Sequence, residues 1–432
     1  IDLGHKPGYE NRRRQNWLTV GLTYAFLYMG RYNMTVCAAA LGSRLSNQQF
    51  GTIIASGSIT YGLSFWLNGP LSDRFGGRKT MIVSAAGSSV MNVIMGLILA
   101  QNANGSLVLP LSVLYAANMY FQSFGAVSII KVNSAWFHVR ERGTFSGVFG
   151  ILISLGFYFA FDWGRWIVKN EPLQYVFFVP AVILAIFAVL NVLLVRDTPS
   201  LAGFDDFDTG DASSGDDGER LPALVIFKRM FSNKVIVTVA CVEFCSGYIR
   251  DSVMSWYLKF ADFTHSAGFA SEHWGVLTCC AGITSGIVGG IISDRVFGSR
   301  RGPVATVYYG IVIVLSLVML ALLGSPILGF VAIGIFMSII GVHGMLSGTA
   351  SMDFGGKKNA GVAIGIIDGF VYLGVTTQAK VLGYVLPRGD AVKDASNWTS
   401  WPLAVTPVAV VGIWLASRLW NARPAGKTAA AH

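Results

Sequence analysis

Long apolar stretches alternate with short polar segments along almost the whole chain. Most run for about 20 residues, the length that an α-helix needs to cross the hydrocarbon core of a bilayer. The first half of the chain has predicted spans at 17–40, 50–70, 81–100, 107–137, 145–161 and 176–195. The second half has them at 235–258, 275–292, 304–323, 327–350, 362–384 and 403–419. This pattern predicts an all-α integral membrane protein with twelve transmembrane helices in two six-helix halves.

Composition supports a membrane protein and excludes several other classes. Of 432 residues, 53% are hydrophobic and 13% are charged, whereas soluble domains carry about 25% charged residues. The net charge of +9 does not form a basic stripe interleaved with aromatic residues, so we expect no nucleic-acid partner. The five cysteines lie in apolar stretches without histidines at metal-ligand spacing, so we expect no metal and no cofactor. No nucleophile–base constellation indicates an enzyme.

The distribution of basic residues sets the predicted orientation. With the N-terminus in the cytoplasm, 22 of the 32 Lys and Arg residues fall on inside segments and six on outside segments. Inside segments of membrane proteins are enriched in Lys and Arg. Both termini are therefore expected in the cytoplasm. The acidic segment 196–232 is predicted to be a flexible cytoplasmic linker, between an N-terminal half at 1–195 and a C-terminal half at 233–428.

The two halves share landmarks at nearly constant spacing. They are Arg31 with Arg250, Asp73-Arg74 with Asp294-Arg295, and Gly143 with Gly361, at offsets of 219, 221 and 218 residues. A duplicated six-helix unit explains all three, and such duplications place the substrate near the bilayer midplane between the halves. We expect the charged loops, with Asp73, Arg74, Asp294 and Arg295, to latch the cytoplasmic side shut.

Arg31 and Arg250 lie within predicted spans at corresponding places in the two halves. A charge at the bilayer centre costs about 2.5–3.5 kcal/mol on insertion scales, so each arginine requires a reason. The guanidinium group is a planar fork of donors that matches phosphate oxygens. Two forks facing one cavity would hold a dianion from both sides. The competing interpretation is structural pairing with an acid such as Glu243, seven residues before Arg250.

Further candidates surround this pair in the sequence. Additional substrate-binding side chains are predicted at Tyr24, Tyr28, Tyr61, Lys131 and Lys380. Glu243 and Asp368 are expected to pair with the cations when the site is empty, so that substrate would displace them and open a gate. Asp251 is predicted to lie at the outer mouth or in a charge network, and His343 to be an ordinary histidine whose hydrogen bonds are satisfied.

The loop from Gly69 to Lys79, Gly-Pro-Leu-Ser-Asp-Arg-Phe-Gly-Gly-Arg-Lys, resembles the signature of the major facilitator superfamily. Within that superfamily the chain is similar to the organophosphate:phosphate antiporters. This second resemblance is carried by Tyr24, Tyr28, Arg31 and Asn33; Tyr61-Gly62-Leu-Ser64; Arg142-Gly143; Arg196-Asp-Thr-Pro199; Tyr248-Ile-Arg250 and Trp256; Ser293-Asp-Arg-Val-Phe297; Lys357-Lys358 and Gly361; and Tyr372-Leu-Gly374.

The resemblance implies alternating access by rocking of the two halves, exchange of an organic phosphate for inorganic phosphate, and paired arginines as phosphate ligands. It also implies a monomer in a bacterial inner membrane. Phe65 stands where glycerol-phosphate carriers have a lysine, and Lys380 is more typical of the hexose-phosphate branch, so the particular ester stays open. A proton- or sodium-coupled organic-anion symporter and a phosphate-ester sensor without transport are the alternatives.

Overall fold

The computed structural model describes residues 6–101, 105–138, 142–209, 228, 231–298 and 300–422. The side chains at 70, 73, 142–149, 294 and 348–364 are outside this description, as is most of the predicted linker at 196–232. All secondary structure assigned to the described residues is helical. The predicted all-α class is therefore confirmed.

The helices follow the predicted apolar stretches. The first part of the chain forms α1 (Tyr9–Leu41), α2 (Asn47–Phe75), α3 (Gly77–Gln101), α4 (Val108–Trp136), α5 (Arg142–Tyr158), the π-helical turn η2 (Phe159–Trp163), α6 (Gly164–Asn170) and α7 (Tyr175–Leu194). The second part forms α9 (Lys234–Phe263), α10 (Phe269–Glu272), α11 (Trp274–Arg295), α12 (Arg301–Ala321), α13 (Leu328–His343), the π-helical turn η4 (Gly344–Ala350), α14 (Ser351–Val385) and α15 (Ser400–Ser417). Short 3₁₀ turns connect some of them.

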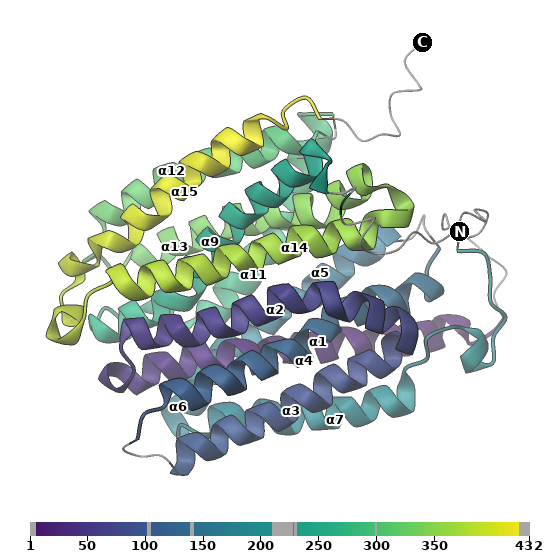
Figure 1. The fold of residues 1–432 in the computed structure, drawn as a ribbon, viewed down its shortest axis with the longest axis horizontal. Coiled ribbons are helices and arrows are strands. Elements are labelled where there is room, and N and C mark those ends of the chain that lie inside the picture. The colour runs from purple at the N-terminus through teal and green to yellow at the C-terminus, as the bar shows by residue number, and fades with distance from the viewer. Residues whose placement is uncertain are drawn as a thin grey trace.

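The long helices run roughly alongside one another in two groups (Figure 1). We call α1–α7, drawn in purple to teal, the first helix group, and α9–α15, drawn in green to yellow, the second helix group. The groups meet along α2 and α14, which lie side by side, and also through α1 with α9 and α5 with α11. The boundary between the groups therefore runs through the middle of the molecule.

Eight helical segments of the described chain are long and apolar enough, by length and composition, to cross a membrane. They lie on α3, α4, the α5–α6 segment, α7, α11, α12, the α13–η4 segment and α15. The other long helices, α1, α2, α9 and α14, coincide with predicted spans but are not among these eight segments of the described chain. Their polar residues face protein rather than lipid, as the site described below shows.

The peripheral helices present apolar side chains outward. On α7 the exposed residues Val182, Ile186 and Val189 follow one face, and on α12 the residues Val307, Ile311 and Val314 do the same. The spacing of three and four residues places each set on one side of its helix. In water such stripes would be unfavourable, so these faces are suited to the acyl chains of a bilayer.

The turn between α2 and α3 is anchored by a residue far along the chain. Gly76 has a left-handed backbone (φ 86°), which glycine adopts without strain. The Asp197 carboxylate lies against Gly76, where an added Cβ would come within 2.6 Å of it. Its Oδ1 accepts a hydrogen bond from the Arg78 backbone N–H at 2.7 Å, in the first turn of α3. The Arg196-Asp-Thr-Pro199 segment thus fixes the Gly-rich loop.

Two glycines let α9 and α14 pack with their backbones almost in contact. A Cβ on Gly247 would lie 2.1 Å from the Val371 carbonyl oxygen, and a Cβ on Gly374 would lie 2.0 Å from the Phe244 carbonyl oxygen. Small residues allow such close approach of membrane helices, where packing replaces the hydrophobic driving force. This contact sets the position of Arg250, three residues after Gly247.

We expect Gly247→Val to destabilise the protein, because the new side chain has to push α14 away from α9. The predicted cost is about 1–3 kcal/mol, the usual range for overpacking. Gly286→Val on α11 is the matched control, since nothing lies within 4 Å of a Cβ there. The melting midpoint of the purified protein in detergent measures the difference, and equal midpoints for the two variants would contradict the packing argument.

Candidate substrate-binding site

A small cavity lies where the two helix groups meet. Its volume is about 20 Å³, which is enough for a water molecule and far less than a small-molecule site needs. The lining residues are Arg31, Tyr32 and Thr35 of α1; Ile54 and Ser58 of α2; Tyr115 and Met119 of α4; Arg250, Asp251 and Ser255 of α9; and Tyr372 and Val375 of α14. Most of them come from α1, α2, α9 and α14, the four long helices outside the eight apolar segments of the described chain.

Three neighbours hold the Arg31 guanidinium in place. Its Nε donates to Gln122 Oε1, its Nη1 to the Tyr372 hydroxyl and its Nη2 to the Tyr61 hydroxyl, each at 3.0 Å. The guanidinium carbon also lies 4.4 Å from the centroid of the Tyr61 ring and 5.0 Å from that of Tyr28, within the range of a cation–π contact. Arg31 is 3% exposed, and its charge is stabilised by neutral groups.

A polar network behind Gln122 fixes that side chain in turn. The Gln122 Nε2 donates to Ser88 Oγ at 3.1 Å, and Ser88 Oγ donates to Asn118 Oδ1 at 2.6 Å. Asn118 Nδ2 donates to the Gly30 carbonyl at 2.9 Å, next to Arg31 in the chain. Because each buried polar group has a partner, the network holds the Arg31 side chain in one orientation. It joins α1, α3 and α4.

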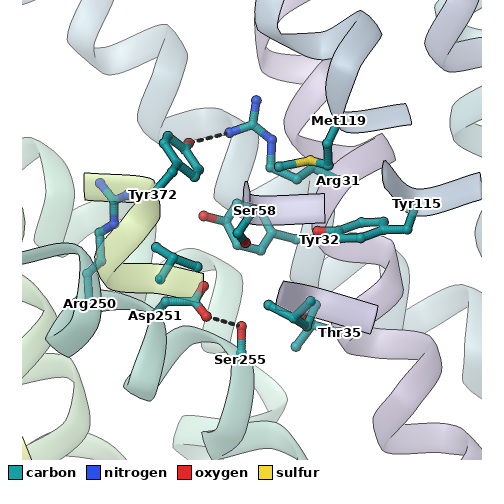
Figure 2. A pocket seen from close by; sticks show the side chains of 12 residues that line it. Arg31, Tyr32, Thr35, Ser58, Tyr115, Met119, Arg250, Asp251, Ser255 and Tyr372 are labelled. Atoms are coloured by element: carbon teal, nitrogen blue, oxygen red, sulfur yellow. Dashed lines mark hydrogen bonds between the residues drawn. The ribbon is translucent and has the colours of Figure 1, made fainter. Parts of the chain in front are cut away.

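Arg250 reaches the same cavity from α9 with a different environment. It is 9% exposed, and its guanidinium makes no hydrogen bond or ion pair with any residue that the structure describes. Figure 2 shows it across the Tyr372 ring from Arg31. Buried charged groups are normally paired. The Arg250 donors are therefore available to an anion in the cavity.

The cavity also contains one carboxylate. Asp251 is 7% exposed, and its Oδ2 accepts a hydrogen bond from Ser255 Oγ at 2.9 Å. The sequence analysis placed Asp251 at the outer mouth or in a charge network, whereas the structure places it in the cavity wall beside the arginine pair (Figure 2). Asp251 and Ser255 are four residues apart and therefore share one face of α9, and this face lines the cavity.

The remaining predicted substrate residues lie at varying distances from the cavity. Tyr61 contacts Arg31 directly, whereas Tyr24 packs edge-on against Tyr28, with ring centroids 5.3 Å apart, behind it. Lys131 and Lys380 are exposed and do not line the cavity. The Lys380 Nζ donates to Thr52 Oγ1 of α2 at 3.3 Å, so it contacts the other helix group without reaching the arginines.

The two acids expected to pair with arginines have other partners. Glu243 is fully buried, and its Oε2 lies 2.9 Å from His343 Nδ1 on α13. Asp368 accepts a hydrogen bond from Ser347 Oγ at 2.5 Å. Neither forms an ion pair with Arg31 or Arg250 among the described residues. The histidine that the sequence left as an ordinary residue is the partner of Glu243.

Of the four residues in the predicted cytoplasmic latch, the structure describes the side chains of Arg74 and Arg295. The side chains of Asp73 and Asp294 lie outside the described residues, so their contacts stay a prediction. Arg74 and Arg295 are exposed in the last turns of α2 and α11. Arg74 lies over the Phe75 ring, 5.7 Å from its centroid.

Contacts between the two helix groups gather at the end predicted to face outside. They include Lys259 Nζ to the Leu45 carbonyl at 2.6 Å, Arg165 to Asp262 at 3.1 Å, and Lys169 to Glu272 at 3.4 Å. Asp162 adds a fourth, because its carboxylate accepts the backbone N–H groups of Gly275 and Val276 at the start of α11. These bonds close that end of the molecule over the cavity.

Sequence reasoning missed several cavity residues. Thr35, Ser58 and Ser255 in the cavity wall, and Gln122 behind Arg31, are neutral polar side chains in apolar stretches, and such residues are common in membrane helices for packing alone. Tyr372 was indicated by the sequence, because it belongs to one of the motifs on which the family resemblance rests. Among the described residues, no group of three or more His, Cys, Asp or Glu side chains could hold a metal ion.

Comparison with known proteins finds relatives that match nearly the whole chain. The chain is 27% identical to the glycerol-3-phosphate transporter of Bacillus subtilis (strain 168), over 96% of this chain and 93% of the relative. It is 25% identical to the hexose-6-phosphate:phosphate antiporter of Escherichia coli (strain K12), over 92% and 88%. It is also 24% identical to the membrane sensor protein UhpC of the same organism, over 96% and 94%.

Solved structures show the same fold. An inward-facing bacterial homolog of the human lysosomal transporter Spinster superposes with a TM-score of 0.70 at 14% identity, over 96% of this chain and 98% of that one. A mutant form of the nucleoside transporter NupG gives 0.65 at 16% identity, over 94% and 99%. The profile of the Major Facilitator Superfamily matches residues 20–377. This integral membrane protein therefore belongs to the Major Facilitator Superfamily, a family of transporters rather than enzymes.

Proposed function

We propose that the chain exchanges an organic phosphate ester for inorganic phosphate across a bacterial inner membrane. The arginine pair would bind the phosphoryl group of either substrate. The relatives named as a glycerol-3-phosphate transporter and a hexose-6-phosphate:phosphate antiporter support this choice, since the similarity covers nearly the whole chain. The predicted halves, 1–195 and 233–428, would be the two units that move relative to each other.

The observation that carries the proposal is the Arg250 guanidinium, which has no partner among the described residues, opposite the Arg31 guanidinium, in which three of the five N–H donors are already hydrogen-bonded. A charge in a membrane interior is costly and indicates a functional site by default. Arg31 is oriented before substrate arrives, whereas Arg250 offers all its donors to an incoming oxyanion. Bidentate contacts from both would bind a tetrahedral phosphoryl group strongly, because charge-assisted hydrogen bonds are among the strongest in proteins.

The size of the cavity supports alternating access. At about 20 Å³ it cannot hold a phosphate ester, so the helix groups have to separate for the ester to enter. The contacts at the outer end keep that side closed in this conformation. Tyr372, from the second helix group, bonds to Arg31 of the first at 3.0 Å. Substrate that takes over this donor would loosen the contact between the groups.

We expect Arg31→Lys and Arg250→Lys each to lower phosphate exchange at least about a hundredfold, because a lysine point charge cannot reproduce the bidentate fork. Exchange is measured as uptake of labelled phosphate into phosphate-loaded proteoliposomes. Arg388→Lys is the matched control, because Arg388 is an exposed residue outside the cavity. Wild-type rates in either cavity variant would refute the role of the arginine pair.

Locking the outer end should stop transport. Lys169 and Glu272 are exposed and paired across the helix groups, so Lys169→Cys with Glu272→Cys, in a variant lacking the native cysteines, can be bridged by a bismaleimide reagent. We expect the bridged protein to lose phosphate exchange because the outer end can no longer open. Each single-cysteine variant treated with the same reagent is the control. Unchanged exchange in the bridged protein would exclude alternating access through this end.

A second candidate function, proton-coupled symport of an organic anion, is favoured by the Glu243–His343 pair. Glu243 is fully buried, and its Oε1 has no hydrogen-bond partner among the described residues. Buried histidine and carboxylate pairs in membranes are typical of proton relays. This pair lies on α9 and α13, within the second helix group.

The two functions differ in what drives uptake. For the antiporter we expect no accumulation of labelled phosphate in vesicles that lack internal phosphate, even with an acidic exterior. Symport predicts accumulation under that proton gradient and its loss in Glu243→Gln. Accumulation of this kind in the wild type would replace exchange with symport as the function.

A further inference from the structure

The cavity has two chemically different ends. Arg31 and Arg250 lie on either side of the Tyr372 ring and supply hydrogen-bond donors (Figure 2). Asp251 and Ser255 lie away from this ring, with the Thr35 hydroxyl facing them across the cavity. A phosphoryl group fits the arginine end because oxyanions need donors. The other end offers oxygen acceptors, so it suits a group that donates hydrogen bonds.

Asp251 retains much of its capacity to accept hydrogen bonds. Its Oδ2 is bonded to Ser255, whereas its Oδ1 has no hydrogen-bond partner among the described residues. It forms no ion pair with Arg250, its neighbour in the chain, nor with Arg31, within the described structure. A buried carboxylate is costly unless it is paired or hydrogen-bonded. The missing partner is therefore expected to come from the substrate.

Charge balance narrows what that partner is. Two guanidinium groups and one carboxylate give the closed cavity a net charge of +1. A phosphate ester dianion with a neutral organic part would leave the occluded site negative. An ester dianion whose organic end carries an ammonium group has a net charge of −1 and neutralises the site. Inorganic phosphate and an ester with a neutral organic part both match this charge only as monoanions, whereas the ammonium-bearing ester matches it as the dianion.

We propose that the organic substrate is a phosphate monoester of a short amino alcohol, and that Asp251 binds its protonated amine while Arg31 and Arg250 bind its phosphoryl group. This inference rests on the proposed function and specifies its substrate class. The Thr35 hydroxyl at the Asp251 end and the Ser58 hydroxyl between the two ends make no hydrogen bond to the described residues and can accept further N–H groups. Asp251 thereby distinguishes amino esters from polyol esters.

The test compares three esters of matched length: 2-aminoethyl, 2-hydroxyethyl and ethyl phosphate. Each competes with labelled phosphate for uptake by the full-length protein in phosphate-loaded proteoliposomes. In the wild type we expect 2-aminoethyl phosphate to compete at least about tenfold better than the other two, the size of a single buried charge contact. In Asp251→Asn this ratio should fall close to one. Asp390→Asn, an exposed residue paired with Lys393, should keep the wild-type ratio.

The comparison of the three esters in the wild type tests the amine site even if Asp251→Asn fails to fold. Equal competition by all three esters, or a preference for 2-hydroxyethyl phosphate, overturns it while phosphate exchange itself stands. A wild type without any phosphate exchange refutes the proposed antiport instead. Stabilisation against heat by each ester is then the remaining readout. Asp251-dependent stabilisation by 2-aminoethyl phosphate alone supports the amine site, and its absence overturns it.

Discussion

The arrangement of the central helices depends on the hydrogen bonds that stabilise the charged guanidinium group of Arg31 inside the membrane. Arg31 is satisfied by Gln122 on α4, Tyr61 on α2 and Tyr372 on α14, so one side chain of α1 draws three other helices toward it. Neutral partners stabilise the cation without cancelling its charge, because hydroxyl and amide oxygens accept hydrogen bonds but carry no full negative charge. The positive potential needed for an anion therefore survives in the cavity. Arg250 adds a second charge whose donors are unused by the described residues.

This requirement explains how polarity is distributed over the helices. The helices α1, α2, α9 and α14 carry most of the polar cavity residues, whereas the peripheral helices α7 and α12 expose continuous apolar faces. Glycines at Gly247 and Gly374 remove side-chain bulk where α9 and α14 meet. Close backbone packing then supplies the stability that a hydrophobic core supplies in water.

In the proposed mechanism, binding and closure use the same atoms. The Tyr372 hydroxyl belongs to the second helix group and accepts a hydrogen bond from Arg31 of the first. The outer end is held by Lys259, Arg165 and Lys169, which reach across the same boundary. A ligand shifts a conformational equilibrium only through contacts that differ between the states. Under the proposed mechanism the Arg31–Tyr372 contact would differ in this way, because separating the helix groups would break it and free an Arg31 donor.

The sequence by itself determined the fold class, the positions of the helices and the two membrane-embedded arginines, because a lipid solvent imposes long apolar stretches and makes every internal charge conspicuous. The tertiary structure decided which polar groups meet. Glu243 pairs with His343 on another helix, Lys380 lies outside the cavity, and Asp251 lines it beside Ser255. Those outcomes depend on helix rotation and on contacts between residues hundreds of positions apart. A periodic pattern along one chain fixes which residues share a face, but not which helix that face will meet.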